Sequence, residues 1–244
     1  MKTNLFAELY ILNLLMAAFS GAASAQTVTI GVSPGNVFEY SYAFNWESTD
    51  PTATIPDEYM EYKNVQLIKL TIKSVSGNVI NLDVTKRFKN GTESTQNGGV
   101  DLDQQIINAP YGFLIIRANA NPKERIYPSG GSATLNETIT KSYPIGQIET
   151  ILYVSVDSSS TSYEKAEIFF DRATGAAAEF QYESREPSGS YKTTIHETLI
   201  LQRSNVGGKM DFYIYAVFLI LIPITLITVF LLMRKRKQNK QKSS

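Results

Sequence analysis

Residues 37–44 read Val-Phe-Glu-Tyr-Ser-Tyr-Ala-Phe, and every second position of this stretch is aromatic. Phe38, Tyr40, Tyr42 and Phe44 project from one side of an extended chain, because successive side chains of a β-strand alternate between its two faces. The residues between them are small, polar or charged and suit a face in contact with water. The stretch therefore predicts a β-strand that buries its aromatic side in a core.

The same period of two recurs in the segments that follow. The further segments that we predict as strands are 68–72, 80–84, 113–116, 133–143, 147–156, 163–170, 176–182 and 191–201. Turns rich in glycine or asparagine separate several of them. No stretch has the periodicity of an amphipathic helix of three turns, and residues 57–64 suffice only for a short helical turn. We therefore predict an all-β antiparallel domain of about ten strands, either a sandwich or a strongly curved, half-barrel-like sheet.

A long apolar segment lies near the C-terminus. Residues 212–233 contain no charged residue, and as a helix they would extend roughly 33 Å, enough to cross a hydrocarbon core of about 30 Å. Basic residues follow at once, and Lys and Arg are retained on the cytoplasmic side of a membrane. We predict one C-terminal transmembrane helix and a basic tail that contacts anionic lipid head groups. The residues predicted to lie at the membrane surface are Arg234, Lys235, Arg236 and Lys237.

The N-terminus carries a second targeting signal. Lys2 precedes a mostly apolar stretch, 9–19, and Ala23-Ser24-Ala25 matches the pattern of a signal-peptide cleavage site. An uncleaved anchor helix is the alternative, but the apolar stretch is short for a membrane span. Together the two signals predict a single-pass protein of the cell membrane with its N-terminal domain outside and its C-terminus in the cytoplasm. The predicted segments are a signal peptide at 1–25, an extracytoplasmic β domain at 26–204, a linker at 205–211, a transmembrane helix at 212–233 and the tail at 234–244.

Charge and composition exclude several classes of function. Residues 26–211 hold 16 basic and 22 acidic residues, so the predicted exported part has a net charge of −6 although the whole chain is neutral. An acidic surface disfavours nucleic acid, whose binding depends on contacts to phosphate. The chain has no cysteine, which excludes disulfides, thiolate metal sites and a thiol nucleophile. It also lacks a phosphate-binding glycine-rich loop and a dinucleotide fingerprint, so we predict no cofactor.

Two N-glycosylation sequons lie in the predicted exported domain. Asn-Gly-Thr at 90–92 falls in a predicted turn, and Asn-Glu-Thr at 136–138 falls within a predicted strand. Chance occurrence is the alternative for both, because the chain is rich in asparagine and threonine. A turn is the more accessible position, so we prefer Asn90 to Asn136 as a glycosylation site.

An acidic stretch punctuated by proline surrounds Trp46, the only tryptophan of the chain. Its acidic residues are Glu47, Asp50, Asp57, Glu58 and Glu61. Two carboxylates beside an aromatic platform are typical of sugar hydrolysis, but spacing along the chain does not give their separation in space. We interpret the stretch as a surface loop. Trp46 belongs either to the core, which we prefer, or to a surface on which a carbohydrate ring stacks.

Two other groups of residues are considered as a metal site and as a catalytic base. Asp101 and Asp103 place two carboxylates on one side of an extended segment, but the surrounding sequence lacks the glycine of the helix-loop-helix calcium pattern. His196, the only histidine, falls on the polar side of the last predicted strand, and no Gly-x-Ser-x-Gly motif exists for it to serve. We interpret both groups as solvated surface, and we predict no metal site and no catalytic residue.

Several short stretches together resemble a group of uncharacterised archaeal exported proteins with a β-rich ectodomain and a single membrane span. They are WESTDP at 46–51, VSG at 75–77, FKNGTE at 88–93, FLIIRAN at 113–119, LNET at 135–138 and FDRATG at 170–175 with Glu179. The resemblance covers most of residues 35–200. It implies the same exported architecture and carries no activity, because that group has none established. The hairpin at 171–175 is also similar to one in curved-sheet lipoprotein carriers.

Three functions fit these observations. The first is a membrane-anchored cell-surface β domain acting as a non-catalytic binding or envelope structural module, with a surface protein, a glycan or a lipid as ligand. The second is a carrier or sensor of an apolar, lipid-like ligand in the concavity of a curved sheet. The third is an extracytoplasmic hydrolase acting on sugars, which requires carboxylates that converge in a cleft. We prefer the first and expect no enzymatic activity.

Overall fold

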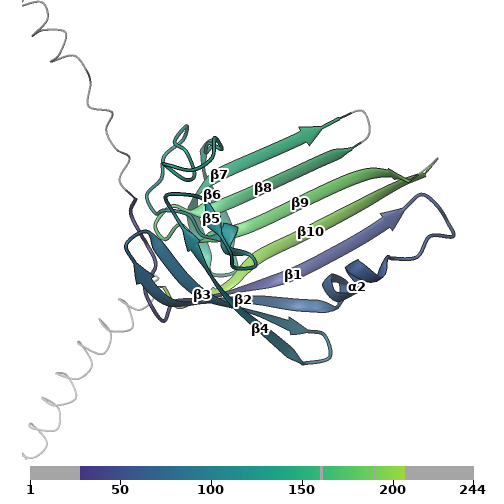
Figure 1. The fold of residues 1–244 in the computed structure, drawn as a ribbon, viewed down its shortest axis with the longest axis horizontal. Helices are drawn as coiled ribbons and strands as arrows, with labels where there is room; N and C mark the ends of the chain where they lie inside the picture. Colours follow the sequence, from purple (N-terminus) through teal and green to yellow (C-terminus); the bar gives the residue numbers. More distant parts are fainter. Residues whose placement is uncertain (1–27, 160–161, 189–190, 207–244) are drawn as a thin grey trace, which may run out of the picture.

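The computed structural model describes residues 28–159, 162–188 and 191–206, and these form one antiparallel sheet of ten strands (Figure 1). The strands are β1 (Val37–Ser48), β2 (Val65–Ser76), β3 (Val79–Phe88), β4 (Glu93–Asp101), β5 (Ile106–Ile107), β6 (Thr138–Tyr143), β7 (Gly146–Ser158), β8 (Tyr163–Asp171), β9 (Ala177–Ser188) and β10 (Tyr191–Ser204). They lie in the order β5-β4-β3-β2-β1-β10-β9-β8-β7-β6. The predicted all-β antiparallel class is confirmed, and the sheet is single and open.

β1 lies in the middle of the sheet, between β2 and β10. Its aromatic side faces the core, where Phe38, Tyr40 and Tyr42 are buried. Directly opposed residues of neighbouring strands share a face, so Leu201 and Leu199, which pair with Tyr40 and Tyr42, lie on the same side. We call this side the inner face of the sheet and the opposite side the outer face.

Pairing of the first and last strands brings the two ends of the described chain together (Figure 1). The Val37 N–H donates to Asn205 Oδ1 at 2.7 Å, and Asn205 Nδ2 donates to the Gly35 carbonyl at 3.0 Å. Asn205, which we predicted as the start of a linker, is therefore bound into the domain. β1 and β10 extend from these termini to the opposite end of the sheet, which we call the distal end.

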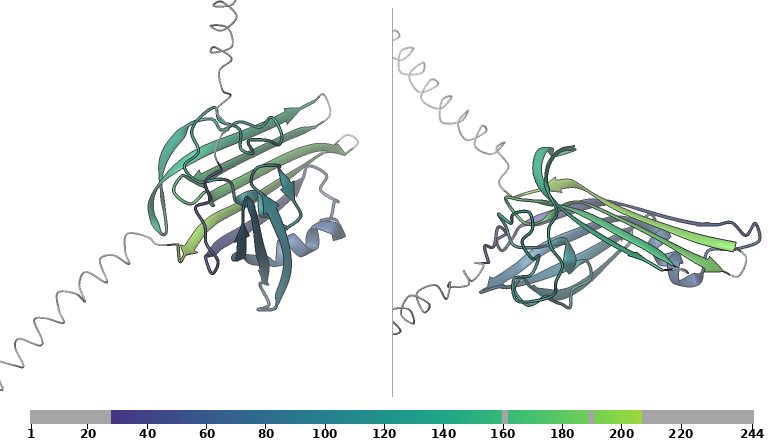
Figure 2. Two further views of the ribbon diagram at one scale, coloured as in Figure 1. Left: turned by 60° about the vertical axis from the view of Figure 1, so that its left-hand side comes forward. Right: turned by 90° about the horizontal axis from the view of Figure 1, so that it is seen from above.

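Residues 102–137, which we call the cover segment, fold over the inner face at the end near the termini, except for the short edge strand β5 within this range (Figure 2). The segment contains a 3₁₀-helix, η1 (Gly112–Leu114), and its residues Leu114, Ile115 and Ile116 are almost completely buried. Phe113 packs against Phe180 of β9 with ring centroids 5.1 Å apart. The cover segment therefore closes the core at this end and leaves the distal end of the inner face uncovered.

Two strand predictions in this region are wrong. The run 113–116 is not a central strand, because it forms η1 and a single bridge between Ile115 and Ala176. Its apolar side chains are buried because the segment lies on top of the core, and burial of this kind has the same sequence pattern as a buried strand. The predicted strand 133–143 begins only at Thr138, because the residues before it belong to the cover segment.

α2 (Asp57–Asn64) is the only α-helix among the described residues, where we expected a short helical turn. It follows β1 and lies beside its distal half (Figure 1). Tyr59 and Tyr62 both stack on Phe44 of β1, each with ring centroids 5.9 Å apart. This places the aromatic side of α2 on the inner face.

No helix in the described ranges is long and apolar enough to cross a membrane. The predicted signal peptide, transmembrane helix and basic tail, with Arg234, Lys235, Arg236 and Lys237, lie outside these ranges and stay predictions.

Candidate functional site

The inner face carries a hollow of about 340 Å³ at the distal end of the sheet. The end of β1, residues 49–56, α2, β9 and β10 all contribute to its walls. We call it the distal hollow, and its lining includes Trp46, Asp50, Glu58, Tyr59, Glu186 and Ile195. Two segments that are far apart in the sequence, 46–59 and 184–195, therefore form one site.

Strand alternation explains the aromatic wall of the hollow. Trp46 follows Phe44 by two positions and lies opposite Ile195, so it belongs to the inner face. It is only half-buried and is not part of the hydrophobic core cluster. Our preference for a core position is therefore wrong, because the cover segment does not reach the end of β1. Trp46 and Tyr59 instead line the hollow.

The charged lining of the hollow is entirely acidic, with three carboxylates and no basic side chain. Asp50, Glu58 and Glu186 take part in no ion pair within the described residues. The hydroxyl and then the amide of Thr52 donate to Asp50 and lower the pKa of its carboxyl, so it is ionised at neutral pH. Burial raises the pKa of Tyr59, and the nearby Glu58 and Glu186 raise it further. The hollow therefore has a negative potential.

The predicted acidic stretch is thus divided between different environments. Only Asp50 and Glu58 reach the hollow. Glu47 lies on the outer face of β1 and Glu61 forms an ion pair with a lysine of β3 at 2.7 Å. The third carboxylate, Glu186, comes from β9, and nothing near Trp46 in the sequence pointed to it. Spacing along the chain therefore identified two of the three acidic residues but not the site.

Sequence reasoning also missed an acidic residue deeper on the inner face. Glu197 of β10 lies opposite Phe44 and Tyr182, and it accepts a hydrogen bond from the Tyr111 hydroxyl of the cover segment at 3.3 Å. Burial raises the pKa of the Glu197 carboxyl. The alternation of β10 did place Glu197 on the same side as Leu199, which was the available signal. This residue marks the boundary between the closed core and the open distal end.

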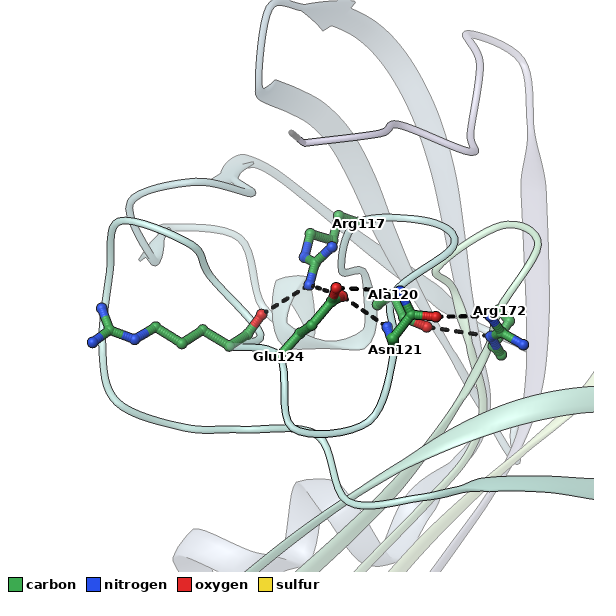
Figure 3. A network of polar contacts seen from close by, with 6 residues as sticks. Arg117, Ala120, Asn121, Glu124 and Arg172 are labelled. Carbon is green, nitrogen blue, oxygen red and sulfur yellow. Dashed lines mark hydrogen bonds and ion pairs between the residues drawn. The ribbon is translucent and has the colours of Figure 1, made fainter. Parts of the chain in front are cut away.

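A polar network holds the cover segment in place (Figure 3). Arg117 is 4% exposed and its Nη2 donates to Glu124 Oε2 at 2.6 Å. Burial raises the pKa of Glu124, but the Asn121 amide and the Arg117 guanidinium outweigh it and lower this pKa to about 2. Arg172, from the β8–β9 hairpin, donates to the Ala120 carbonyl at 3.2 Å. The network joins the cover segment to the sheet and is structural.

The residues considered for calcium binding stabilise a turn. The Asp103 N–H donates to Asp101 Oδ1 at 2.8 Å, and the Ser129 hydroxyl donates to Asp103 Oδ1 at 2.8 Å. Within the described ranges no group of three or more His, Cys, Asp or Glu could hold a metal ion. His196 is exposed on the outer face, as predicted, opposite Glu183.

Both residues predicted as glycosylation sites are exposed. Asn90 lies in the turn between β3 and β4, as expected. Asn136 precedes β6, so the expectation that it lies inside a strand is wrong. Modification of either residue stays a prediction.

Comparison of the sequence with known protein families gives no match, and no curated protein matches it. No function therefore comes from a relative, and the resemblance to archaeal exported proteins stays a prediction.

Proposed function

We propose that the protein is a membrane-anchored, non-catalytic binding module of the cell surface, and that its distal hollow accepts a cationic group of the ligand. The observation that supports this most is the set of three unpaired carboxylates, Asp50, Glu58 and Glu186, beside Trp46 and Tyr59. A lysine or arginine side chain of a surface protein has the matching chemistry. Its charge would interact with the carboxylates, and it would lie against an aromatic face.

The mutual repulsion of the three carboxylates also supports this proposal. Some carboxylates of the described residues lie beside bases, as in the pairs Lys73–Asp83 and Arg87–Glu93, and others do not. The acidic residues of the hollow lack such partners, so they repel one another in the free protein. A bound cation relieves that repulsion, whereas an anion would increase it.

The position of the hollow suits a surface receptor. The last described residue, Val206, lies near the start of β1 and is followed after five residues by the predicted membrane span. β1 then runs to the distal end over about 36 Å, at roughly 3.3 Å per residue. With the span inserted as predicted, the hollow is the part of the inner face that lies far from the bilayer.

The two other functions fit the hollow less well. An apolar ligand would have to bury three carboxylates, which is costly without partners. The space beneath the cover segment is filled by Leu114, Ile115 and Ile116. Sugar hydrolysis requires a protonated carboxyl as general acid, and the lowered pKa of Asp50 opposes that role. Whether Glu58 or Glu186 acts as a general acid is tested below with neutral oligosaccharides.

Trp46 is the only tryptophan, so its fluorescence reports on the distal hollow directly. We expect a lysine-rich peptide to change this fluorescence saturably, and the affinity to fall as the salt concentration rises. The double variant E58Q/E186Q should weaken binding at least about tenfold, because each lost charge-assisted contact contributes of the order of 1 kcal/mol.

The matched control is E47Q/E183Q, which removes the same charge from the outer faces of β1 and β9. Equal weakening by both double variants would mean that only the net charge attracts the peptide, and the proposal would fail. It would also fail if neutral oligosaccharides, and not the peptide, changed the fluorescence. Release of sugar from such an oligosaccharide would establish the hydrolytic function instead.

A further inference from the structure

The turn between β3 and β4 presents the first sequon in an ordered and open form. Asn90 Oδ1 accepts hydrogen bonds from the Thr92 N–H at 3.0 Å and from the Thr92 hydroxyl at 2.8 Å. Gly91 between them has φ +86 and nothing within 4 Å of the place of a Cβ. The two residues that define the sequon are thus held together on an exposed turn. The Asn90 amide nitrogen donates no hydrogen bond to any described residue.

The hairpin that carries Asn90 is held firmly by α2. The Lys89 N–H donates to the Asn64 carbonyl at 2.8 Å, and Lys89 Nζ donates to the Lys63 carbonyl at 2.6 Å. These contacts fix the turn at the edge of the domain. The position of the turn is therefore defined by the domain around it.

The surroundings of Asn90 leave room for a sugar. An open hollow of about 730 Å³ adjoins the turn, and Met60, Glu61, Asn64, Phe88 and Lys89 line it together with the sequon. Met60 is 40% exposed and so presents an apolar surface beside the turn. A pyranose ring has one apolar face and a rim of hydroxyls. The side chains of Met60 and Phe88 suit contact with the apolar face of the ring. Those of Glu61 and Asn64 suit hydrogen bonds with its hydroxyls.

Asn136 is different in its hydrogen bonding. Its Oδ1 accepts the N–H of Val154 at 2.8 Å, and its own N–H donates to the Leu152 carbonyl at 2.7 Å. Both bonds tie it to β7, and Thr138 of the same sequon begins β6. In the folded domain this asparagine is tied to the neighbouring strand at the sheet edge by its backbone and by Oδ1, whereas the side-chain hydrogen bonds of Asn90 stay within its own turn.

We propose that Asn90 is an N-glycosylation site of this protein and that Asn136 is not. The donor is an oligosaccharide linked through phosphate to a membrane lipid. Asn90 Nδ2 forms a bond to C1 of the first sugar and loses a proton, and the bond from C1 to the phosphate oxygen breaks, so that the lipid phosphate leaves. The proposal requires export of the domain, as the proposed function does, but no property of the distal hollow.

Mass spectrometry of the intact chain, isolated from the membranes of its own cells, tests this. We expect the peptide containing Asn90 to carry a hexose-based mass increment and the peptide containing Asn136 to be unmodified. N90D keeps the oxygen that Thr92 bonds but lacks the amide nitrogen, so it should lose the increment while remaining folded. T92S keeps the sequon and should retain the increment, and N136D should leave the mass of the glycan unchanged.

An unmodified Asn90 in the wild-type chain would overturn the proposal, and so would a glycan on Asn136. If N90D kept the mass increment, the modification would lie at another residue and the proposal would also be overturned. Trp46 fluorescence of N90D with the lysine-rich peptide separates this proposal from the first. We expect N90D to bind the lysine-rich peptide as the wild type does, because the turn lies outside the distal hollow.

Discussion

Alanine in place of Gly175 is expected to destabilise the protein by at least about 3 kcal/mol. Gly175 lies between β8 and β9 with φ +76, a conformation that costs an L-residue about 1–2 kcal/mol. A Cβ atom there would also overlap the carbonyl oxygen of Ile116 in the cover segment. The Ile116 N–H donates to the Gly175 carbonyl at 2.9 Å, so neither the cover segment nor the β8–β9 hairpin can move away without losing this bond. We therefore expect the substitution to displace the cover segment from the β8–β9 hairpin at this contact.

Urea unfolding followed by circular dichroism measures this effect, and Gly77 provides the control. Gly77 has φ +55 in the turn between β2 and β3, and no atom lies within 4 Å of the place of its Cβ. Its replacement by alanine carries the conformational cost alone, about 1 kcal/mol. The difference between the two variants reports the contact with Ile116. Equal shifts of the unfolding midpoint would show that this contact does not hold the cover segment.

Most strands could be predicted because each carries its own alternation. β4 and β5 were missed, because residues 93–99 are polar or glycine and show no alternation, and β5 has only two residues. In β1, β2 and β3 most residues expected on the buried side are buried, as Tyr40, Ile68 and Leu82 illustrate. Two positions differ, because Phe44 is only half-buried and the polar Thr85 is buried. The alternation of side chains with a period of two is a property of the strand itself, so it can be recognised whichever strand lies beside it. The hairpins at Gly77 and Gly175 were predictable for the same reason, because a turn needs only its own residues.

The cover segment could not be predicted in this way. Residues 113–116 are as apolar as a central strand, and burial by a sheet and burial by packing on top of a sheet select the same side chains. The distal hollow was equally hidden, because it forms only when β9 and β10 bring Glu186 beside Trp46. Glu197 is an intermediate case, since its face was predictable but its partner Tyr111 was not. Which residues meet in such a site depends on how distant strands pair, and the composition of one segment does not show this.

Replacing Glu124 with glutamine is the second change with a large expected effect, about 3 kcal/mol at pH 7. The loss of its charge leaves the guanidinium of Arg117, which is only 4% exposed, without a counter-ion. Breaking a buried ion pair from one side costs roughly 3–5 kcal/mol for this reason. The control is Glu149→Gln, because Glu149 is 59% exposed and its pair with Arg172 contributes less than about 1 kcal/mol.

The effect of Glu124→Gln must also depend on pH. The pKa of Glu124 is about 2 in the folded protein, against 4.5 for an ordinary glutamate carboxyl, so folding releases a proton from this group in acid. The contribution of the ion pair to stability is therefore complete above about pH 4.5 and is lost as the pH falls toward 2. Urea unfolding of wild type and variant at several pH values should show two curves that are separate at pH 7 and converge near pH 2. A gap that stays constant over this range would mean that Glu124 acts through packing and that the charge on its carboxyl has no part in holding Arg117.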